Sequence, residues 1–449
     1  MVKKSIKNFK EAEGYLYDIP RFTSKHGIEE TKVFLEKLGS PDLSMKIIHV
    51  AGTNGKGSVC AYLDSVLRKA GLKVGLFTSP HLVDICERFR INGENISYGE
   101  FYSEFINIYD SLDWEAIEKD KPGAYHPTFF EFLFFMAMEL FKKAGVEWCI
   151  LETGLGGLLD ATNSVHTKEA AVITRIDLDH MEYLGNTKAE IAVQKAGIIG
   201  SGKPYVYGDF VPEASSAIIS EAEKKGEGKA YAAGPANIKV LQNLPERVDF
   251  CLVDGYYKNV YLCLDTIASY QAENASLAVK AIEAAGLETV VTPEILKEGL
   301  MECHWAGRME EVLEGVYVDG AHNPDGIRAF LDTVAKDKEG TKRILVFGVV
   351  GDKDYSGMIG EIARSGYFES VLVTPLKTGR SADVGSIAGV FAGCGMKTEV
   401  FQDSVKALKE AIKKKKDIEK DAPERFPGVR IYITGSLYLV GEIKEYVEF

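Results

Sequence analysis

The chain has 449 residues, of which 46% are hydrophobic, and its formal net charge is −13. This length and composition are typical of a globular protein with two or three domains. The negative charge argues against broad nucleic-acid binding, which depends on a surplus of Lys and Arg. The N-terminal lysines are not followed by an apolar block, and the most apolar run, residues 129–141, is short and contains two glutamates. We therefore expect a cytoplasmic protein that does not span a membrane.

The first predicted helix covers residues 29–38, where Val33, Phe34 and Leu38 have helical spacing ahead of Gly39. An apolar run at 47–51 follows. It breaks into a glycine-rich loop before an amphipathic segment, which predicts a strand, a loop and a helix.

The residues of this loop are Gly52, Thr53, Asn54, Gly55, Lys56, Gly57 and Ser58. Glycines let backbone N–H groups approach a polyphosphate, the lysine adds a positive charge, and a nearby hydroxyl can hold Mg²⁺. The strict P-loop has a glycine at the position of Val50 and a Ser or Thr directly after the lysine, so this loop is a variant. A tight turn without a ligand is the alternative, but such turns rarely need three glycines and a lysine. The sequence therefore predicts a nucleotide phosphate site.

A second strand at 73–78 ends at Ser79, and together with the preceding strand and helix it forms a βαβ unit of a parallel sheet. Ligands gather at the carboxyl ends of such strands, which makes Ser79 a candidate metal ligand. The alternative for this residue is a simple Ser-Pro turn.

Two further strands end in polar residues. The strand at 146–152 ends at Glu152, where a carboxylate can hold Mg²⁺ directly or through water. The strand at 171–176 precedes His180, which by itself would more often be a loop histidine. Because four strand ends carry polar groups, we expect one shared crevice. Residues 129–143 between these strands predict a buried apolar helix.

Lys195 lies among small and apolar neighbours in a helix that begins near Thr187. A lysine in a protein interior needs a specific partner or role. Residues 200–255 contain no recognisable chemistry. Further helices are predicted to begin at 268 and 293, and residues 304–308 are predicted to be a linker.

After this linker, strands and helices alternate again, with strands predicted at 315–319, 343–348, 370–374, 398–401 and 429–434. We therefore predict an α/β fold with two domains. Residues 1–303 form an N-terminal P-loop-type parallel-sheet ATPase domain, and residues 304–449 form a smaller Rossmann-like α/β domain without a phosphate loop.

These segments together resemble the folylpolyglutamate synthase/dihydrofolate synthase family, relatives of the peptidoglycan Mur ligases, over almost the whole chain. The resemblance rests on the phosphate loop and on the motifs at 78–82, 152–157, 159–163, 178–180, 194–198 and 319–324. It implies an ATP-dependent ligase that joins a folate carboxylate to the amine of L-glutamate through an acyl phosphate.

The resemblance also implies roles for individual residues. The phosphate loop with Lys56 would bind ATP, and the ligands of two Mg²⁺ ions would be Ser79, Glu152, His180 and a carbamylated Lys195. Adenosine contacts would fall on Asn274, Arg308 and Asp319, with the catalytic His322 beside them. The pterin pocket of dihydropteroate-binding relatives would fall on Thr128, Phe130, Asp160 and Ala161. One departure is Leu158, where the family often has arginine, in the stretch that bears on pterin and tail affinity.

The expected partners are therefore small molecules, namely ATP, L-glutamate and a folate or dihydropteroate. We expect a monomer that binds neither nucleic acid nor membranes. A Mur-type ligase acting on a UDP-linked peptide should have an additional N-terminal domain, whereas only about fifty residues precede this loop. A nucleotide switch or motor would hydrolyse ATP independently of folate and glutamate.

Overall fold

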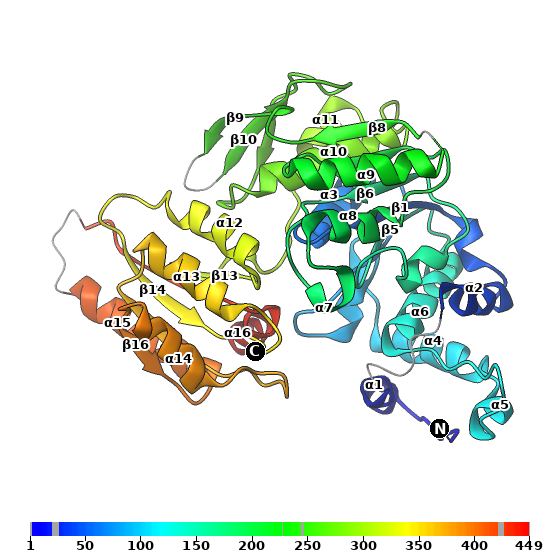
Figure 1. Ribbon diagram of the computed structural model, residues 1–449, viewed down its shortest axis with the longest axis horizontal. Coiled ribbons are helices and arrows are strands. Elements are labelled where there is room, and N and C mark those ends of the chain that lie inside the picture. The colour runs from blue at the N-terminus through cyan, green and yellow to red at the C-terminus, as the bar shows by residue number, and fades with distance from the viewer. Residues whose placement is uncertain (1, 20–26, 227, 244–246, 421–425, 449) are drawn as a thin grey trace. The chain divides into compact units, whose positions relative to one another are not determined.

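The computed structural model describes residues 2–19, 27–226, 228–243, 247–420 and 426–448 (Figure 1). The chain forms two compact units. The first comprises residues 1–239, 250–262 and 273–303, and the second comprises 240–249, 263–272 and 304–449. The second unit therefore includes two short segments that precede the domain boundary expected at 303/304.

An eight-stranded sheet forms the centre of the first unit, with the strand order β4-β3-β2-β5-β1-β6-β7-β8. Strands β2, β5, β1, β6, β7 and β8 are parallel, whereas β3 and β4 form an antiparallel hairpin at one edge. The strands are β1 (Lys46–Ala51), β2 (Val74–Phe77), β3 (Phe89–Ile91), β4 (Glu94–Asn95), β5 (Trp148–Glu152), β6 (Ala170–Ile173), β7 (Tyr205–Gly208) and β8 (Ala230–Ala233). The four strands predicted to end in polar residues are neighbours, as expected.

Several helices of the first unit begin at side-chain caps that are visible in the sequence. Thr128 and Thr187 each form a capping box, in which the hydroxyl accepts from the backbone and a glutamate three residues later reaches back. The helices are α1 (Phe9–Asp18), α2 (Ile28–Lys37), α3 (Lys56–Lys69), α4 (Tyr98–Asp110), α5 (Trp114–Glu118), α6 (Phe129–Ala144), α7 (Met181–Leu184), α8 (Lys188–Ala196), α9 (Pro212–Lys224), α10 (Gln271–Ala284) and α11 (Pro293–Met301). Short 3₁₀ helices cover Pro41–Ser44, Ile85–Arg88 and Ala161–Ser164.

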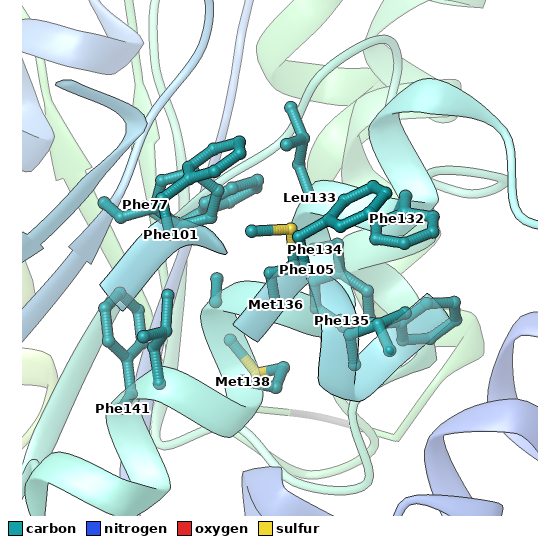
Figure 2. Packing of buried hydrophobic residues seen from close by; sticks show 14 of the residues in the cluster. Phe77, Phe101, Phe105, Phe132, Leu133, Phe134, Phe135, Met136, Met138 and Phe141 are labelled. Carbon is teal, nitrogen blue, oxygen red and sulfur yellow. The ribbon is translucent and has the colours of Figure 1, made fainter. Parts of the chain in front are cut away.

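Helix α6 is the apolar helix that the sequence predicts at 129–143, and its residues 131–141 are all buried. Figure 2 shows its phenylalanines and methionines packed against Phe77 from β2 and against Phe101 and Phe105 from α4. The rings of Phe105 and Phe132 stack with centroids 5.1 Å apart. This aromatic core fixes the N-terminus of α6 close to the ends of the central strands.

The second unit contains a six-stranded sheet with the order β12-β13-β17-β14-β15-β16. All its pairings are parallel except β12 with β13. Its elements are β12 (Arg308–Leu313), β13 (Val316–Asp319), α12 (Pro324–Val334), β14 (Lys342–Phe347), α13 (Tyr355–Ser365), β15 (Ser370–Val373), α14 (Val384–Gly393), β16 (Thr398–Val400), α15 (Ser404–Lys420), β17 (Val429–Thr434) and α16 (Leu437–Glu448). A separate three-stranded sheet consists of β9 (Ile238–Asn243), β10 (Val248–Leu252) and β11 (Leu262–Leu264).

The fold confirms the predicted α/β class and corrects one detail. Residues 308–313 form β12, an antiparallel edge strand. The sequence analysis predicted a linker at 304–308 and no strand before 315. This strand alternates between more and less exposed side chains, and its register with β13 is broken by two irregularities, so its strand pattern is weak. Among the described residues, no helix is long and apolar enough to cross a membrane.

Candidate active site

The phosphate loop connects β1 to α3 in a backbone conformation that favours glycine. Gly52 has φ +153° and Gly55, the N-cap of α3, has φ +92°. A Cβ atom at Gly52 would collide with the hydroxyl of Thr174, and one at Gly55 would collide with the side-chain oxygen of Asn274. The two glycines therefore permit both the chain reversal and the close approach of neighbouring side chains. Ser58 is buried in the first turn of α3.

The end of β6 holds the loop in place. The backbone N–H groups of Thr53 and Asn54 donate to the carbonyl of Arg175 at 2.9 and 3.2 Å. The Thr174 hydroxyl donates to the carbonyl of Asn54 at 2.7 Å, and the Thr53 hydroxyl donates to that of Asp177 at 3.0 Å. The loop is thus fixed from the neighbouring strand, as a preformed anion site requires.

Two lysines donate to the same carbonyl of this loop. The Nζ atom of Lys56 lies 3.1 Å from the Gly52 oxygen and 3.3 Å from that of Thr53. The Nζ atom of Lys195, on α8, lies 2.7 Å from the same Gly52 oxygen, and the Lys195 residue is only 4% exposed. Two of the predicted catalytic residues therefore meet at the loop, although they are far apart in sequence.

Two of the predicted metal ligands also lie together. Glu152 at the end of β5 is buried, and its Oε2 atom accepts from the backbone N–H of Ser79 at 2.9 Å. Burial raises the pKa of Cys60 on α3 well above its usual range, and the negative charge of Glu152 raises this pKa further. The Glu152 carboxylate therefore lies close enough to α3 to affect the ionisation of a side chain on that helix. A carboxylate and a hydroxyl are oxygen donors of the kind that Mg²⁺ prefers, so these two residues fit the ion.

His180 lies at the N-cap of α7 with φ +50°, and its side chain is 38% exposed. Its backbone N–H donates to Asp179 at 2.9 Å. In the described part of the chain, no three side chains from His, Cys, Asp and Glu come close enough to hold a metal ion. The structure therefore brings Glu152 to the backbone of Ser79, and Lys195 to the loop. The metal roles of Ser79, Glu152, His180 and Lys195 stay predictions.

The glycine loop after Glu152 packs against several predicted substrate-binding residues. The ring of Phe130 fills the space that a Cβ atom of Gly154 would occupy, and Thr128 caps the helix that carries this ring. Asp160, which is 4% exposed, accepts from the backbone N–H of Leu155 at 2.8 Å. Asp160 thus holds the glycine loop from inside, and Ala161 begins the 3₁₀ helix that follows.

A buried chain of hydrogen bonds links Asp160 to the strand that carries the phosphate loop. The Thr162 hydroxyl donates to Asp160 at 2.5 Å, and the Nε2 atom of His49 on β1 lies 2.8 Å from that hydroxyl. Because the hydroxyl hydrogen points to the carboxylate, His49 donates through Nε2–H. Burial lowers the pKa of His49 well below its usual range, which keeps the ring neutral. The sequence analysis missed His49, although a histidine inside an apolar strand is a visible signal.

A second missed pair lies between β2 and α6. Arg88, which is buried, donates to the Nδ1 atom of His81 at 2.9 Å, and its guanidinium lies 5.5 Å from the ring centroid of Phe129. Burial and the Arg88 charge lower the pKa of His81 to about 3. A fixed positive charge therefore stands next to the N-terminus of α6.

The second unit contains the other three predicted residues. Asp319 ends β13, and its buried carboxylate accepts from the Tyr270 hydroxyl at 2.6 Å and from the backbone N–H groups of Met309 and Ala321. Burial raises the pKa of Asp319, whereas the charge of Arg308 lowers it. Nδ1 of His322 lies 2.8 Å from the Gly320 carbonyl, so the ring donates through Nδ1–H, and in the neutral form of this ring the Nε2 atom is an acceptor.

Comparisons with known proteins show which family and which solved structures the chain resembles. A family model described as Mur ligase, glutamate ligase domain, matches residues 307–421. A dihydrofolate synthase/folylpolyglutamate synthase of Bacillus subtilis is 36% identical, and the match covers 78% of this chain and 82% of the relative. The structure of Mycobacterium tuberculosis folylpolyglutamate synthase complexed with ADP and AMPPCP gives a TM-score of 0.87 at 28% identity and covers 98% of both chains. The bifunctional folylpolyglutamate synthase/dihydrofolate synthase of Yersinia pestis, complexed with AMPPNP and Mn ion, gives 0.81 at 27% identity and covers 100% of both.

Proposed function

The chain belongs to the folylpolyglutamate synthase/dihydrofolate synthase family, and we propose that the phosphate loop, Lys56 and Lys195 form the reaction centre with which it ligates L-glutamate to a folate at the expense of ATP. The observation that carries this proposal is the meeting of two lysines at the Gly52 carbonyl. One of these lysines comes from the loop itself and the other from a buried position on α8.

We assign to Lys56 the role of stabilising the negative charge of the γ-phosphate. The first backbone N–H groups of α3 have no partner within the helix and would donate to a polyphosphate, and the Lys56 ammonium lies in the same loop. Phosphoryl transfer depends on positioning and on stabilising charge at the transferring group. When the folate carboxylate attacks the γ-phosphorus, ADP leaves and an acyl phosphate forms.

The amide bond then forms when the neutral amine of L-glutamate attacks the acyl carbon and phosphate leaves. His322 is assigned to this catalysis, because its Nε2 atom is an acceptor while Nδ1–H is held by Gly320. We assign Asn274, Arg308 and Asp319 to the adenosine.

Divalent metal binding is assigned to Ser79 and Glu152, with His180 as a further ligand. Bound Mg²⁺ would neutralise phosphate charge and hold the nucleotide in register.

Lys195 is assigned to the second metal position as a carbamate. Reaction of its neutral Nζ with CO₂ forms an N–C bond and releases one proton, which converts a buried cation into an anion with two oxygen donors. Burial is consistent with this assignment, because an ammonium group at 4% exposure is costly.

The folate side of the site is assigned to Thr128, Phe130, Asp160 and Ala161. Phe130 offers a ring face against the glycine loop. The assay below distinguishes dihydropteroate from reduced folate as the substrate of this site.

The test is ADP release measured with dihydropteroate or tetrahydrofolate, each with and without L-glutamate. We expect release that requires both a pteridine substrate and glutamate. A Mur-type ligase would respond to neither pteridine, and a nucleotide switch would release ADP without either substrate.

Lys56→Ala is the matching variant, and Lys69→Ala at the other end of α3 is its control. We expect the first to reduce turnover by at least about a hundredfold, because it removes a charge that acts on the transferring phosphoryl group. Lys69 pairs with Glu298 and Glu302 away from the loop, so its loss should leave turnover unchanged. Full activity of a folded Lys56→Ala enzyme would contradict the assignment.

A further inference from the structure

The turn that follows Lys195 presents four carbonyl groups in a row. Helix α8 ends at Ala196, and the carbonyls of Ala196, Gly197, Ile198 and Ile199 all accept from lysine side chains. The last carbonyls of a helix have no partner within the helix, and they carry the negative end of its dipole. Cations therefore stabilise this turn.

Lys225, the C-cap of α9, contributes the first of these cations. Its Nζ atom lies 2.7 Å from the Gly197 oxygen, 3.3 Å from that of Ile199 and 3.4 Å from that of Ala196. One ammonium group thus contacts three of the four carbonyl groups of the turn.

Lys168, which precedes β6, contributes the second. Its Nζ atom donates to the Ile198 oxygen at 2.9 Å and to the side-chain oxygen of Asn163. The amide nitrogen of Asn163 in turn donates to the Gly197 oxygen at 3.3 Å and to the Leu158 oxygen at 3.1 Å. The two lysines and Asn163 therefore hold the whole turn.

The position of Lys168 is unfavourable for a charged group. The residue is 9% exposed, and burial together with the nearby charge of Lys225 lowers its pKa to about 7. Lys203 nearby differs, because its side chain is 40% exposed and pairs with Glu169 at 3.6 Å. Burying the Lys168 ammonium group costs free energy. The hydrogen bonds that Lys168 gains in return are those that hold the turn after α8.

We propose that Lys168 and Lys225 are positioning residues for Lys195, fixing the end of α8 so that the Lys195 side chain reaches the phosphate loop. The proposal rests on the proposed function in one respect, namely that Lys195 contributes to metal binding. The proposal goes further because it assigns a role to two lysines that belong neither to the phosphate loop, nor to the strand ends, nor to α8.

The physical argument concerns the precision of the Lys195 side chain. Its Nζ atom is 2.7 Å from Gly52, so a small shift at the end of α8 would break this contact. Groups that orient a metal ligand from behind typically change metal affinity or activity about 10–100-fold when they are removed. Methionine has nearly the shape of lysine but cannot donate, so Lys168→Met removes the hydrogen bonds with little loss of volume.

The experiment measures the dissociation constant of Mn²⁺ by electron paramagnetic resonance, with AMPPNP bound to the full-length enzyme. The variants are Lys168→Met, Lys195→Ala and their double variant, and the control is Lys203→Met. Lys225→Met is a second test at a half-buried site, in case Lys168→Met fails to fold. Ligation of glutamate by the wild-type enzyme is assayed separately, so that failure of the proposed function is recognised by itself.

We expect Lys168→Met to weaken Mn²⁺ binding about tenfold, Lys225→Met to weaken it in the same direction, and Lys203→Met to have no effect. The double variant should bind no more weakly than Lys195→Ala, because Lys168 acts through Lys195. Unchanged affinity in folded Lys168→Met and Lys225→Met would overturn the proposal. The proposal would also be overturned if the double variant bound Mn²⁺ more weakly than Lys195→Ala. The same holds if Lys168→Met lost Mn²⁺ affinity while Lys195→Ala lost none. Either result would mean that Lys168 affects metal binding without acting through Lys195.

Discussion

Lys168 offers a test of how burial changes the ionisation of a single residue. Its pKa falls from 10.5 in the unfolded chain to about 7 in the folded protein. Below pH 7 both states bind the proton, and the folded state bears the full cost of the buried ammonium group. Between pH 7 and 10.5 the folded state has released the proton while the unfolded state still binds it, so stability rises with pH across this window.

We therefore predict that wild type gains stability relative to Lys168→Met as the pH rises from 7 to 10, by up to a few kcal/mol. The measurement is the urea midpoint of both proteins across this range. Lys225 and Asp160, the other charges that act on Lys168, are present in both proteins. Parallel profiles would mean that Lys168 titrates normally.

Single residues were predictable where their chemistry was conspicuous. Lys56, Glu152 and Lys195 could be chosen because a lysine in a glycine loop, an acid at a strand end and a lysine in an apolar helix are each unusual. Lys168 and Asn163 could not, because their roles depend on the carbonyls of a turn that lies about thirty residues later in the chain. Hydrogen bonds to distant backbone atoms leave no pattern in a local sequence.

Helix α3 begins and ends beside a glycine with positive φ, and the two positions differ in their surroundings. A Cβ atom at Gly55 would collide with Asn274, whereas one at Gly71 would meet nothing within 4 Å. Both positions share the cost of a left-handed conformation for alanine, roughly 1–2 kcal/mol.

We predict that Gly71→Ala loses only this amount and keeps its affinity for ATP, whereas Gly55→Ala loses more stability and binds ATP at least about tenfold more weakly, because the loop must move away from Asn274. Denaturation curves and nucleotide titrations of the two variants would test this. Equal losses would show that the contact with Asn274 has no influence on the loop.

The 3₁₀ helix after Asp160 provides a second comparison, between two buried threonines. The hydroxyl of Thr162 lies between His49 and Asp160, whereas that of Thr153 has no hydrogen-bond partner in the described structure. Replacing threonine by valine removes the hydroxyl and preserves the shape.

We predict that Thr162→Val costs about 1–3 kcal/mol, because it leaves the donor of His49 unpaired in the interior and removes one of the two hydrogen bonds that Thr162 donates to the Oδ1 atom of Asp160. Thr153→Val should be neutral or stabilising, since it removes a buried polar atom that has no partner. Thermal unfolding of both variants is the measurement, and a larger loss from Thr153→Val would contradict the hydrogen-bond assignment.

Elements were predictable to a greater extent than their connections. The central strands and α6 were found because their residues are buried on both faces and give continuous apolar runs. The antiparallel edge strands β3, β4 and β12 were not found, because short or half-exposed strands lack such runs. Their pairing is decided by the sheet that they join.

At the scale of the whole molecule, the second unit is built from separate segments of the chain. Residues 263–272 belong to it, and Ala268 lies in its hydrophobic core. The Tyr270 hydroxyl from this segment donates to Asp319 at the end of β13. A boundary at 303/304 would therefore remove part of the support of β13.

We predict that Tyr270→Phe in the full-length protein increases hydrogen–deuterium exchange in peptides that contain β13 and leaves those that contain β1 unchanged, because a hydrogen bond to a buried carboxylate contributes about 1.5–3 kcal/mol. Tyr355→Phe, at the start of α13, is the control. Equal exchange in β13 for both variants would mean that residues 263–272 do not stabilise this strand.

The position of β1 at the centre of its sheet has a consequence for synthesis of the protein on the ribosome. The loop after β1 depends on the Arg175 carbonyl and on contact with Asn274, which follow it by more than one hundred and more than two hundred residues. At about 5–20 residues per second, the interval between Gly55 and Asn274 is roughly 10–45 s. Throughout that time the nascent chain already contains its nucleotide-binding motif but lacks Asn274, and for the first part of it Arg175 is missing as well. ATP can therefore stabilise this enzyme only late in its own translation.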